Sequence, residues 1–351
     1  MQDKGDAPVI SVCIVTGRRL AMLDAVLADL QAQEGPPAFE LLVCSDGDPG
    51  VPSTVLSRFP EARVCEVERA LPGAARNLLV TKARGELLLF LDDDVRLRTD
   101  LLDRYARVAA EHPTMAVFGG PNDTPPTSSR FQFVQGAALA SLVGSGPVRR
   151  RYGAHPPGVA DERFFILCNL AIRRSAMVPF ADDLVCAEEN AVLAELTRQG
   201  AAMYYDPELA VYHERRSTLR GFAEQMHKYG RGRGQLLAGR QRTFRPAFVA
   251  PSVLLAYLTA LPVLLATLGP LTAVPALAWL VAVGGAAAWI ARTVRRPWDV
   301  GLAAILLVVL HVCYGSGVLR GVVSGRGPVP SPEPVAWTGA EPEPGTVANL
   351  P

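Results

Sequence analysis

The sequence lacks an excess of charge of either sign. Only 20% of its 351 residues are Asp, Glu, Lys or Arg, and the formal net charge at pH 7 is +1. Proteins that bind nucleic acid through bulk electrostatics carry many more positive charges, so this class is excluded and no nucleic-acid partner is expected. Intrinsic disorder over most of the chain is also excluded, because 49% of the residues are hydrophobic.

The sequence also lacks paired cysteines and a secretory signal pattern. Its six cysteines include no Cys-x-x-Cys pair, so neither a structural zinc site nor a disulfide framework is expected. We expect these cysteines to be reduced and mostly buried as small apolar residues. The first residues show no basic segment followed by an apolar one, which favours a cytoplasmic N-terminal domain.

Charged residues are absent from a long stretch in the C-terminal part of the chain. The run 246–291 has no Asp, Glu, Lys or Arg. As a helix it would extend roughly 70 Å, about twice the hydrocarbon thickness of a bilayer. A break at Gly269 divides it into two spans, and an uncharged segment, 300–319, follows. We therefore predict about three transmembrane helices within residues 247–323. His311 and several glycines leave an interfacial or re-entrant placement open for the third.

Basic residues flank this apolar region on one side. Residues 214–246 hold nine Lys/Arg and two Asp/Glu, the linker 292–299 holds three Arg, and the loop 271–273 holds none. The positive-inside rule then predicts a multi-pass protein of the cell membrane with a cytoplasmic N-terminal domain. Residues 214–246 are interpreted as a basic amphipathic segment whose arginines face the headgroups of membrane lipids. The proline-rich residues 324–351 predict a disordered tail.

Residues 1–213 alternate short apolar runs with helical patterns. This alternation predicts an α/β domain in which helices cover both faces of a mostly parallel sheet. The stretch 119–158 is rich in Gly, Pro and Ser and predicts a long loop, or a loop with a helix, of functional use. The expected strands are 9–16, 39–44, 62–67, 87–91 and 115–118, and the expected helices are 20–33, 72–84 and 101–112.

Acidic turns follow two of these strands. Asp46 ends the second strand, and Asp92, Asp93 and Asp94 follow the apolar strand 87–91. Ligands of an open parallel sheet bind beyond the carboxyl ends of its strands, so we expect the two turns to converge. Adjacent carboxylates repel one another unless a cation compensates them, and Mg²⁺ or Mn²⁺ prefers such oxygen ligands. We therefore predict a divalent cation that binds substrate phosphates; a solvated acidic turn is the alternative.

An ordered set of motifs resembles the family 2 glycosyltransferases. The resemblance covers about residues 8–230 and implies the GT-A fold, a Rossmann-like α/β domain. It also implies a nucleotide-sugar donor (UDP-, GDP- or dTDP-linked), a divalent cation and inversion at the anomeric carbon. With the apolar C-terminal region, the chain resembles membrane-anchored bacterial enzymes of polysaccharide and glycolipid synthesis. The motifs lie at 9–30, 44–47, 73–77, 85–94 and 187–190.

The resemblance implies roles for residues that would contact the donor. Asp46 would contact the nucleotide base, and Arg76 would lie near the nucleotide. Asp92 would reach the ribose, with Asp93 beside it in the nucleotide-sugar site. Thr16 suits the nucleotide-facing end of the first strand, although the surrounding residues depart from the usual family opening.

The resemblance also implies a metal site and a general base. Asp94 would coordinate the cation, together with His213, which follows a predicted strand. Glu189 matches the second acid of the family's Glu-Asp motif, which deprotonates the acceptor hydroxyl. A glutamate in place of aspartate is a departure, because it is one methylene longer. Glu188 points about 100° away on the same helix and is expected to support the base or the acceptor.

The acceptor is expected to bind between the insertion 119–158 and the membrane. We place Asn169 at this site. Gln225, Lys228 and Tyr229 resemble the Gln-x-x-Arg-Trp motif of membrane-linked synthases, with Lys for Arg and Tyr for Trp. The adjoining basic segment favours a lipid-linked acceptor, such as a polyprenyl-phosphate carrier, or a growing surface polysaccharide.

The sequence thus predicts a membrane-anchored, inverting, metal-dependent glycosyltransferase. Three other functions stay open. A processive polysaccharide synthase subunit would make long polymer, and a nucleotidyltransferase would release pyrophosphate rather than nucleoside diphosphate. A non-catalytic membrane adaptor with a degenerate GT-A domain would keep its activity in cells after Asp94→Ala.

Overall fold

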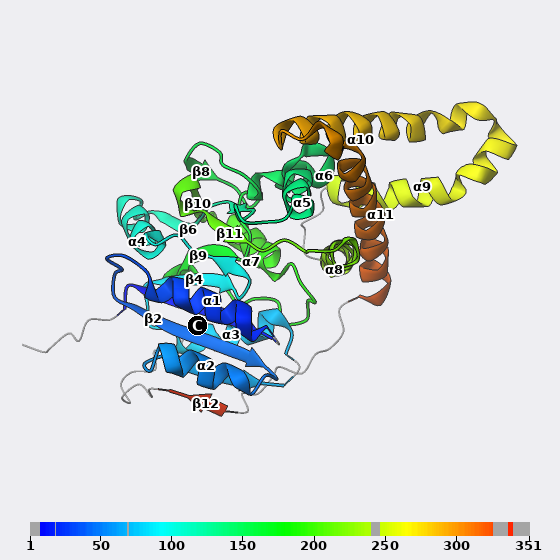
Figure 1. Ribbon diagram of the computed structural model, residues 1–351. Helices are drawn as coiled ribbons and strands as arrows, with labels where there is room; N and C mark the ends of the chain where they lie inside the picture. The colour runs from blue at the N-terminus through cyan, green and yellow to red at the C-terminus, as the bar shows by residue number, and fades with distance from the viewer. Residues whose placement is uncertain (1–7, 18, 69, 240–245, 326–335, 340–351) are drawn as a thin grey trace, which may run out of the picture.

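The computed structural model describes residues 8–17, 19–68, 70–239, 246–325 and 336–339. An α/β domain on one side joins a group of long helices on the other (Figure 1). A nine-stranded sheet forms the centre of the α/β domain, in the order β12-β3-β2-β1-β4-β9-β6-β10-β8. The strands are β1 (Ile10–Thr16), β2 (Phe39–Asp46), β3 (Arg63–Val67), β4 (Leu87–Asp92), β6 (Met115–Gly119), β8 (Gly158–Ala160), β9 (Asn169–Arg173), β10 (Ala202–Tyr205) and β12 (Ala336–Thr338).

Most strands of this sheet run in one direction. β3, β2, β1, β4, β6 and β10 point the same way, whereas β9 is inserted antiparallel between β4 and β6. β8 and β12 are antiparallel at the two edges. The predicted α/β fold with a mostly parallel sheet is confirmed. The shared direction brings the carboxyl ends of β1, β2 and β4, and with them Thr16, Asp46 and Asp92, to one edge.

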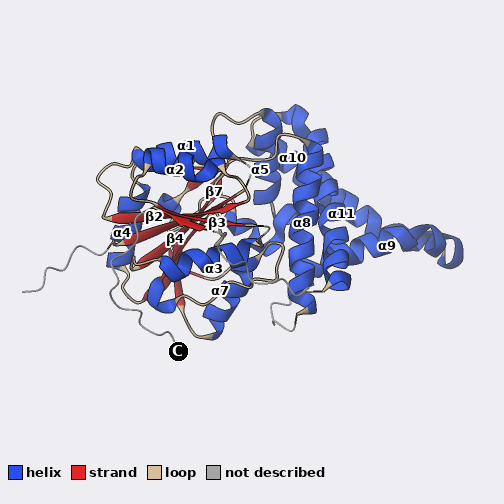
Figure 2. Cartoon of the chain, turned by 90° about the horizontal axis from the view of Figure 1, so that it is seen from below, coloured by secondary structure: helices blue, strands red, loops and turns tan. Residues whose placement is uncertain are grey.

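Helices cover both faces of the sheet (Figure 2). In β4, side chains alternate between two hydrophobic clusters: Leu87, Leu89 and Leu91 pack on one face, and Leu88 and Phe90 on the other. Burying each such side chain contributes about 1.5–3 kcal/mol, which explains why this strand reads as an unbroken apolar run. The covering helices are α1 (Leu20–Gln31), α2 (Gly50–Arg58) and α4 (Leu101–Glu111) against the first cluster, and α3 (Pro72–Lys82) and α7 (Glu188–Arg198) against the second.

The insertion 119–158 contains helices and contributes to a second small sheet. Helix α5 (Arg130–Ala140) begins at a capping box in which the Ser129 hydroxyl accepts from the Gln132 backbone N–H. α5 packs against the long C-terminal helices. It is followed by α6 (Leu142–Ser145) and the 3₁₀ helix η1 (Gly146–Arg151), and the three-stranded sheet consists of β5 (Val95–Arg96), β11 (Val211–His213) and β7 (Asn122–Asp123).

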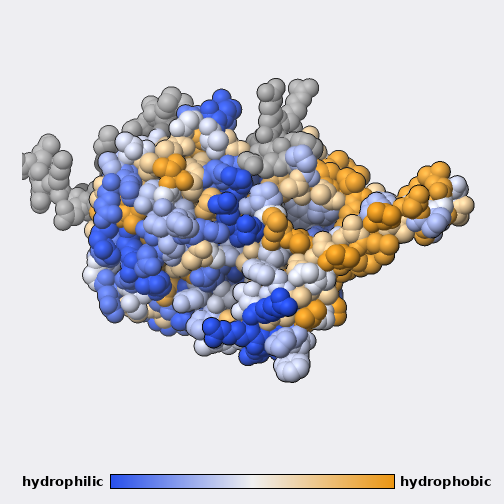
Figure 3. Space-filling view, turned by 90° about the horizontal axis from the view of Figure 1, so that it is seen from above, coloured by the Kyte–Doolittle hydropathy of each residue, from blue (hydrophilic) through white to orange (hydrophobic). Residues whose placement is uncertain are grey.

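Three C-terminal helices are long and apolar enough to cross a membrane. α9 and α10 form a hairpin that projects from the body, and its surface is largely hydrophobic (Figures 1 and 3). The buried share of the candidate spans rises from 11% in the first to 39% in the third, because α11 packs against the rest of the protein. The helices are α9 (Pro246–Leu268), α10 (Val274–Thr293) and α11 (Val300–Ser324), with the 3₁₀ turns η4 (Pro270–Ala273) and η5 (Pro297–Asp299) before the second and third.

Helix α8 (Leu219–Ala238) packs tightly against α11 through glycines on both helices. A Cβ added to Gly230 or Gly234 of α8 would overlap the α11 backbone. A Cβ on Gly317 or Gly321 of α11 would likewise overlap the α8 backbone. Small residues four apart allow two helices to approach this closely. The arginines of segment 214–246 were predicted to face the headgroups of membrane lipids. This prediction is wrong for Arg233, which is 7% exposed. Arg240, Arg242 and Arg245 lie outside the described residues.

The predicted disorder of residues 324–351 needs a correction. Ala336–Thr338 forms strand β12, which pairs antiparallel with β3 at the edge of the sheet. Trp337 packs on the second hydrophobic cluster, and the Lys82 ammonium lies 5.8 Å from its ring centroid. An edge strand offers unpaired backbone groups that a short segment can satisfy. Residues 326–335 and 340–351 lie outside the described residues.

Candidate functional site

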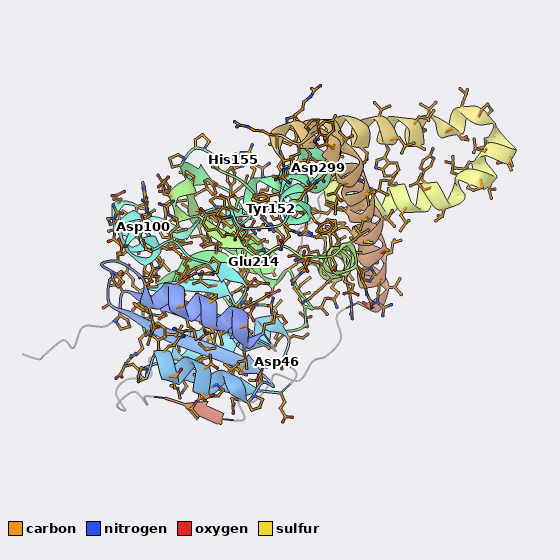
Figure 4. The ribbon with its side chains drawn as sticks, in the orientation of Figure 1. Asp46, Asp100, Tyr152, His155, Glu214 and Asp299 are labelled. Atoms are coloured by element: carbon orange, nitrogen blue, oxygen red, sulfur yellow. The ribbon has the colours of Figure 1, made fainter. Side chains whose placement is uncertain are left out.

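A cavity of about 1100 Å³ extends from the carboxyl edge of the sheet to the apolar C-terminal helices. Its sheet end is lined by the strand and helix ends that carry Thr16, Asp46 and Asp92. Its other end is lined by apolar residues of α9 and α11. Figure 4 labels Asp46, at the end of β2, and Tyr152, which follows η1; both line the cavity from different parts of the fold. One continuous space thus joins the predicted donor site to the candidate membrane region.

Arg76 connects the acidic turn of β4 to the start of α7. Its guanidinium lies 3.1 Å from Asp92 Oδ1 and forms an ion pair with Glu188. Arg76 and Glu188 are both buried. Burial raises the pKa of Glu188, an effect that the Arg76 charge opposes. The three residues line the cavity, and Arg76 fixes the two acidic segments relative to each other.

Asp93 does not reach the cavity, which corrects its predicted role at the donor. Its side chain is fully buried, and its Oδ2 accepts a hydrogen bond of 2.7 Å from the Thr16 hydroxyl. It also pairs with Arg19, which begins α1 and lines the cavity. Burial raises the pKa of Asp93 to about 6. Consecutive residues of a turn cannot all point to the same side, and Asp93 points into the core. Its carboxylate therefore holds the side chains of Thr16 and Arg19 in position.

Asp94 and His213 lie next to each other where the large sheet meets the three-stranded sheet. His213 Nε2 lies 3.1 Å from Asp94 Oδ1, because β11 pairs with β5 directly after the acidic turn. Asp94 also pairs with Arg19, and Arg216 lies 3.9 Å away. Burial alone would raise the pKa of Asp94, but His213 and the two guanidiniums hold it below its usual range. The carboxylate is thus kept ionised.

The side chains around the acidic turn after β4 could bind a divalent cation. Ligand atoms of Asp92, Cys168 and His213 lie within 4.8 Å of one another, and Asp94 adjoins His213. Burial raises the pKa of the Cys168 thiol, so its sulfur remains protonated and is a poor ligand for a hard ion. Asp92 and His213, with Asp94 beside His213, offer oxygen and imidazole ligands that suit Mn²⁺ or Mg²⁺.

Glu189 stands at the first turn of α7 and faces the cavity. The preceding Ala187 has a φ of 69°, an uncommon conformation for a residue with a Cβ, and it places both glutamates at the helix N-terminus. Glu189 Oε1 accepts a hydrogen bond of 2.7 Å from the Asn190 side chain and one of 3.3 Å from Arg151. Arg151 was not predicted, because a run of three arginines does not indicate which one is buried.

The residues predicted to bind the acceptor divide into two groups. Gln225, Lys228 and Tyr229 line the cavity from α8, and Gln225 Nε2 donates to the Tyr229 hydroxyl at 3.1 Å. Asn169 is fully buried away from the cavity, which corrects its predicted role. It accepts from the Tyr105 hydroxyl at 2.7 Å and donates to a backbone oxygen, so its amide joins core elements.

The family model "Glycosyl transferase family 2" matches residues 11–176. These residues form a family 2 glycosyltransferase domain, and the resemblance inferred from the motifs is confirmed. The protein is therefore a glycosyltransferase. Among the curated proteins, none matches the sequence significantly.

The chain is also similar to solved structures. The mannosyltransferase PcManGT from Pyrobaculum calidifontis, in complex with GDP-Man and Mn²⁺, is 17% identical with a TM-score of 0.57, over 91% of this chain and 88% of that one. This likeness supports the GT-A fold. S. aureus TarS 1-349 is 15% identical with a TM-score of 0.44, over 89% of this chain and 91% of that one.

Proposed function

We propose that the protein is an inverting, metal-dependent glycosyltransferase of the cytoplasmic membrane face. It would move a sugar from a nucleotide-sugar donor to a lipid-linked acceptor or a growing surface polysaccharide. The observation that carries this proposal is the single cavity, which joins the acidic edge of the sheet to the candidate membrane helices. The basic residues of segment 214–246 and linker 292–299 support the cytoplasmic orientation.

The donor would bind at the carboxyl edge of the sheet. Asp46 would contact the base, Asp92 the ribose, and Thr16 the nucleotide, since all three line this end of the cavity. Arg76 would act through Asp92 and Glu188, because its guanidinium is already engaged by both. The GDP-Man bound in the structurally similar PcManGT supports a nucleotide-sugar donor, which can be UDP-, GDP- or dTDP-linked.

Asp94 and His213, with Asp92 beside them, would hold the divalent cation. The cation supplies a Lewis acid for the negative charge that develops on the departing diphosphate. The Mn²⁺ in the structurally similar PcManGT supports the use of a divalent cation. In the chain itself, Arg19 and Arg216 lie beside Asp94 and add positive charge where the diphosphate would leave.

Glu189 would be the general base. Among the described residues, both hydrogen bonds to its carboxylate are made at Oε1, which leaves Oε2 for an acceptor hydroxyl. Glu189 would take the hydroxyl proton as that oxygen attacks the anomeric carbon, and the bond to the diphosphate would break on the opposite side. A single displacement of this kind inverts the anomeric configuration. Gln225, Lys228 and Tyr229 would contact the acceptor.

A donor screen tests the proposal. The purified full chain in detergent would be supplied with Mn²⁺, a membrane-lipid extract and UDP-, GDP- or dTDP-linked sugars. We expect one donor to yield nucleoside diphosphate in proportion to glycosylated product. Release of pyrophosphate would identify a nucleotidyltransferase, and a ladder of long polymer would identify a processive synthase. No turnover with any donor would contradict the proposal.

Removal of the cation gives a separate prediction. Chelation with EDTA should abolish transfer, and added Mn²⁺ or Mg²⁺ should restore it. Asp94→Asn should reduce kcat on the order of 10²-fold, because it removes a charged ligand at the leaving diphosphate. Asp103→Asn is the matched control, since Asp103 lies on α4 and pairs only with Arg107 among the described residues. Unchanged activity in EDTA would refute metal dependence.

A further inference from the structure

Two buried arginines from distant elements converge beside Glu189. Arg151 ends η1 and Arg233 lies on α8, and they are 6% and 7% exposed. Their guanidiniums donate to the same acceptor, Asn190 Oδ1, at 2.8 and 3.0 Å. Two like charges that share one neutral oxygen repel each other at short range in a poorly solvated site. Such a site favours an anion.

The surrounding protein neutralises only part of this charge. Arg151 has Glu189 as its ion-pair partner, but its Nε is buried and makes no hydrogen bond to any residue that the structure describes. Arg233 has no ion pair with any carboxylate of the described residues; its guanidinium lies 3.9 Å from the ring centroid of Phe248 and forms a hydrogen bond with the Tyr314 hydroxyl. Burial, together with the nearby Arg151, lowers the pKa of Arg233. The two guanidiniums thus share one nearby carboxylate, that of Glu189, and the pair keeps an excess of positive charge.

The arginines stand between the two parts of the cavity. Towards the sheet they adjoin Glu189 and, beyond it, the cluster around Asp92. Towards the candidate membrane helices the lining becomes apolar, with Phe248, Pro251 and Leu254 from α9 and Leu310 from α11. A ligand that fills both parts would carry a polar group at the arginines and an apolar chain along α9 and α11.

We propose that Arg151 and Arg233 bind the phosphate of a lipid acceptor, whose hydrocarbon chain lies along the apolar part of the cavity lined by α9 and α11. Guanidinium groups bind phosphate oxygens through paired, charge-assisted hydrogen bonds, and packing against the Phe248 ring holds the Arg233 guanidinium in position. This inference rests on the proposed function, since it names the chemical class of the acceptor. The phosphate would hold the hydroxyl-bearing end of the acceptor beside Glu189.

Binding of farnesyl phosphate to the full chain in detergent tests the inference. Isothermal titration calorimetry would compare farnesyl phosphate with farnesol, which lacks the phosphate, and with inorganic phosphate, which lacks the chain. We expect farnesyl phosphate to bind at least tenfold more tightly than either. Equal binding of farnesol would show that the phosphate is not recognised, and equal binding of inorganic phosphate would show a free-phosphate site; both results would overturn the inference.

Variants place the binding at the two arginines. Arg151→Gln and Arg233→Gln should each weaken farnesyl phosphate binding at least tenfold, and Arg233→Lys should retain part of it. Arg220→Gln is the matched control, because Arg220 lies on the same helix and its side chain is 90% exposed. Wild-type affinity in both glutamine variants would overturn the inference. Thermal unfolding and Mn²⁺-nucleotide binding verify that each variant is folded.

The same variants separate this inference from the proposed function. Glu189→Gln should abolish sugar transfer but not weaken farnesyl phosphate binding, since it removes a negative charge next to the phosphate. If no donor supports transfer while Arg233→Gln still loses farnesyl phosphate, the phosphate site stands and the proposed transferase reaction fails. If transfer occurs and both arginine variants bind farnesyl phosphate normally, only the phosphate site fails.

Discussion

Glu189→Gln should reduce kcat about 10²–10⁴-fold, the range that a general base contributes. The glutamine oxygen can still accept hydrogen bonds from Asn190 and Arg151, so the local geometry is retained while the proton acceptor is lost. Nucleotide-sugar affinity should be unchanged, because Asp46 and Asp92 would contact the nucleotide, whereas Glu189 would contact the acceptor hydroxyl. Steady-state release of nucleoside diphosphate, measured together with binding of the donor, checks both expectations.

Glu195→Gln provides the control for this experiment. Glu195 lies on the same helix, α7, and pairs with Arg198 at the surface. Its replacement should leave kcat within about twofold of wild type, since surface substitutions are usually nearly neutral. If Glu189→Gln behaved like this control, the proton would be accepted by another group, and the proposed base would be wrong.

Gly321→Leu should detach α8 from α11. Any Cβ at this position overlaps the backbone oxygen of Arg231, so the two helices must separate. Overpacking of this kind costs about 3 kcal/mol. Because α8 also carries Tyr229 and Arg233 to the cavity, we expect transfer to fall together with the free energy of unfolding. Thermal unfolding in detergent and diphosphate release on the same samples test the two effects.

Gly301→Leu is the matched substitution on the same helix. Nothing lies within 4 Å of a Cβ added at Gly301, so leucine can extend into open space there. We expect an unchanged unfolding temperature and unchanged activity. If Gly321→Leu were equally harmless, the close glycine packing between α8 and α11 would not position the cavity residues.

Local sequence patterns predicted the helices and strands that bury many apolar side chains at regular spacing. Leu87–Leu91 is entirely apolar because β4 lies in the centre of the sheet with both faces covered. Helix α2 was not predicted, since only Val51 and Val55 are buried and its apolar pattern is weak. Strand β12 has three residues, and its pairing with β3 depends on a contact between distant parts of the chain.

The cavity residues also divide into those that local motifs identify and those that only tertiary contacts place. Motif order identified Asp46, Asp92 and Glu189, all of which line it. The sequence could not show that Asp93 turns into the core, because that depends on the Thr16 hydroxyl 77 positions away. It could not select Arg151 either, since tertiary contacts with Glu189 and Asn190 distinguish it from its two arginine neighbours.

The basic segment 214–246 does not lie wholly at the surface of the protein. Segment 214–246 is strongly basic, yet the structure shows that part of this charge is internal: Arg233 lies in the cavity beside Glu189. Composition alone assigns such a segment to the membrane surface. Tertiary packing against α11 turns one side of α8 towards the candidate acceptor site instead.

The most direct test follows the sugar into the lipid phase. Membranes that contain the full chain would be incubated with Mn²⁺ and radiolabelled nucleotide sugars, and then extracted with organic solvent. The account predicts that label from one donor enters the lipid phase with an inverted anomeric configuration and one nucleoside diphosphate released per sugar, and that Glu189→Gln abolishes this transfer. Label that stays in water-soluble products with every donor would contradict it.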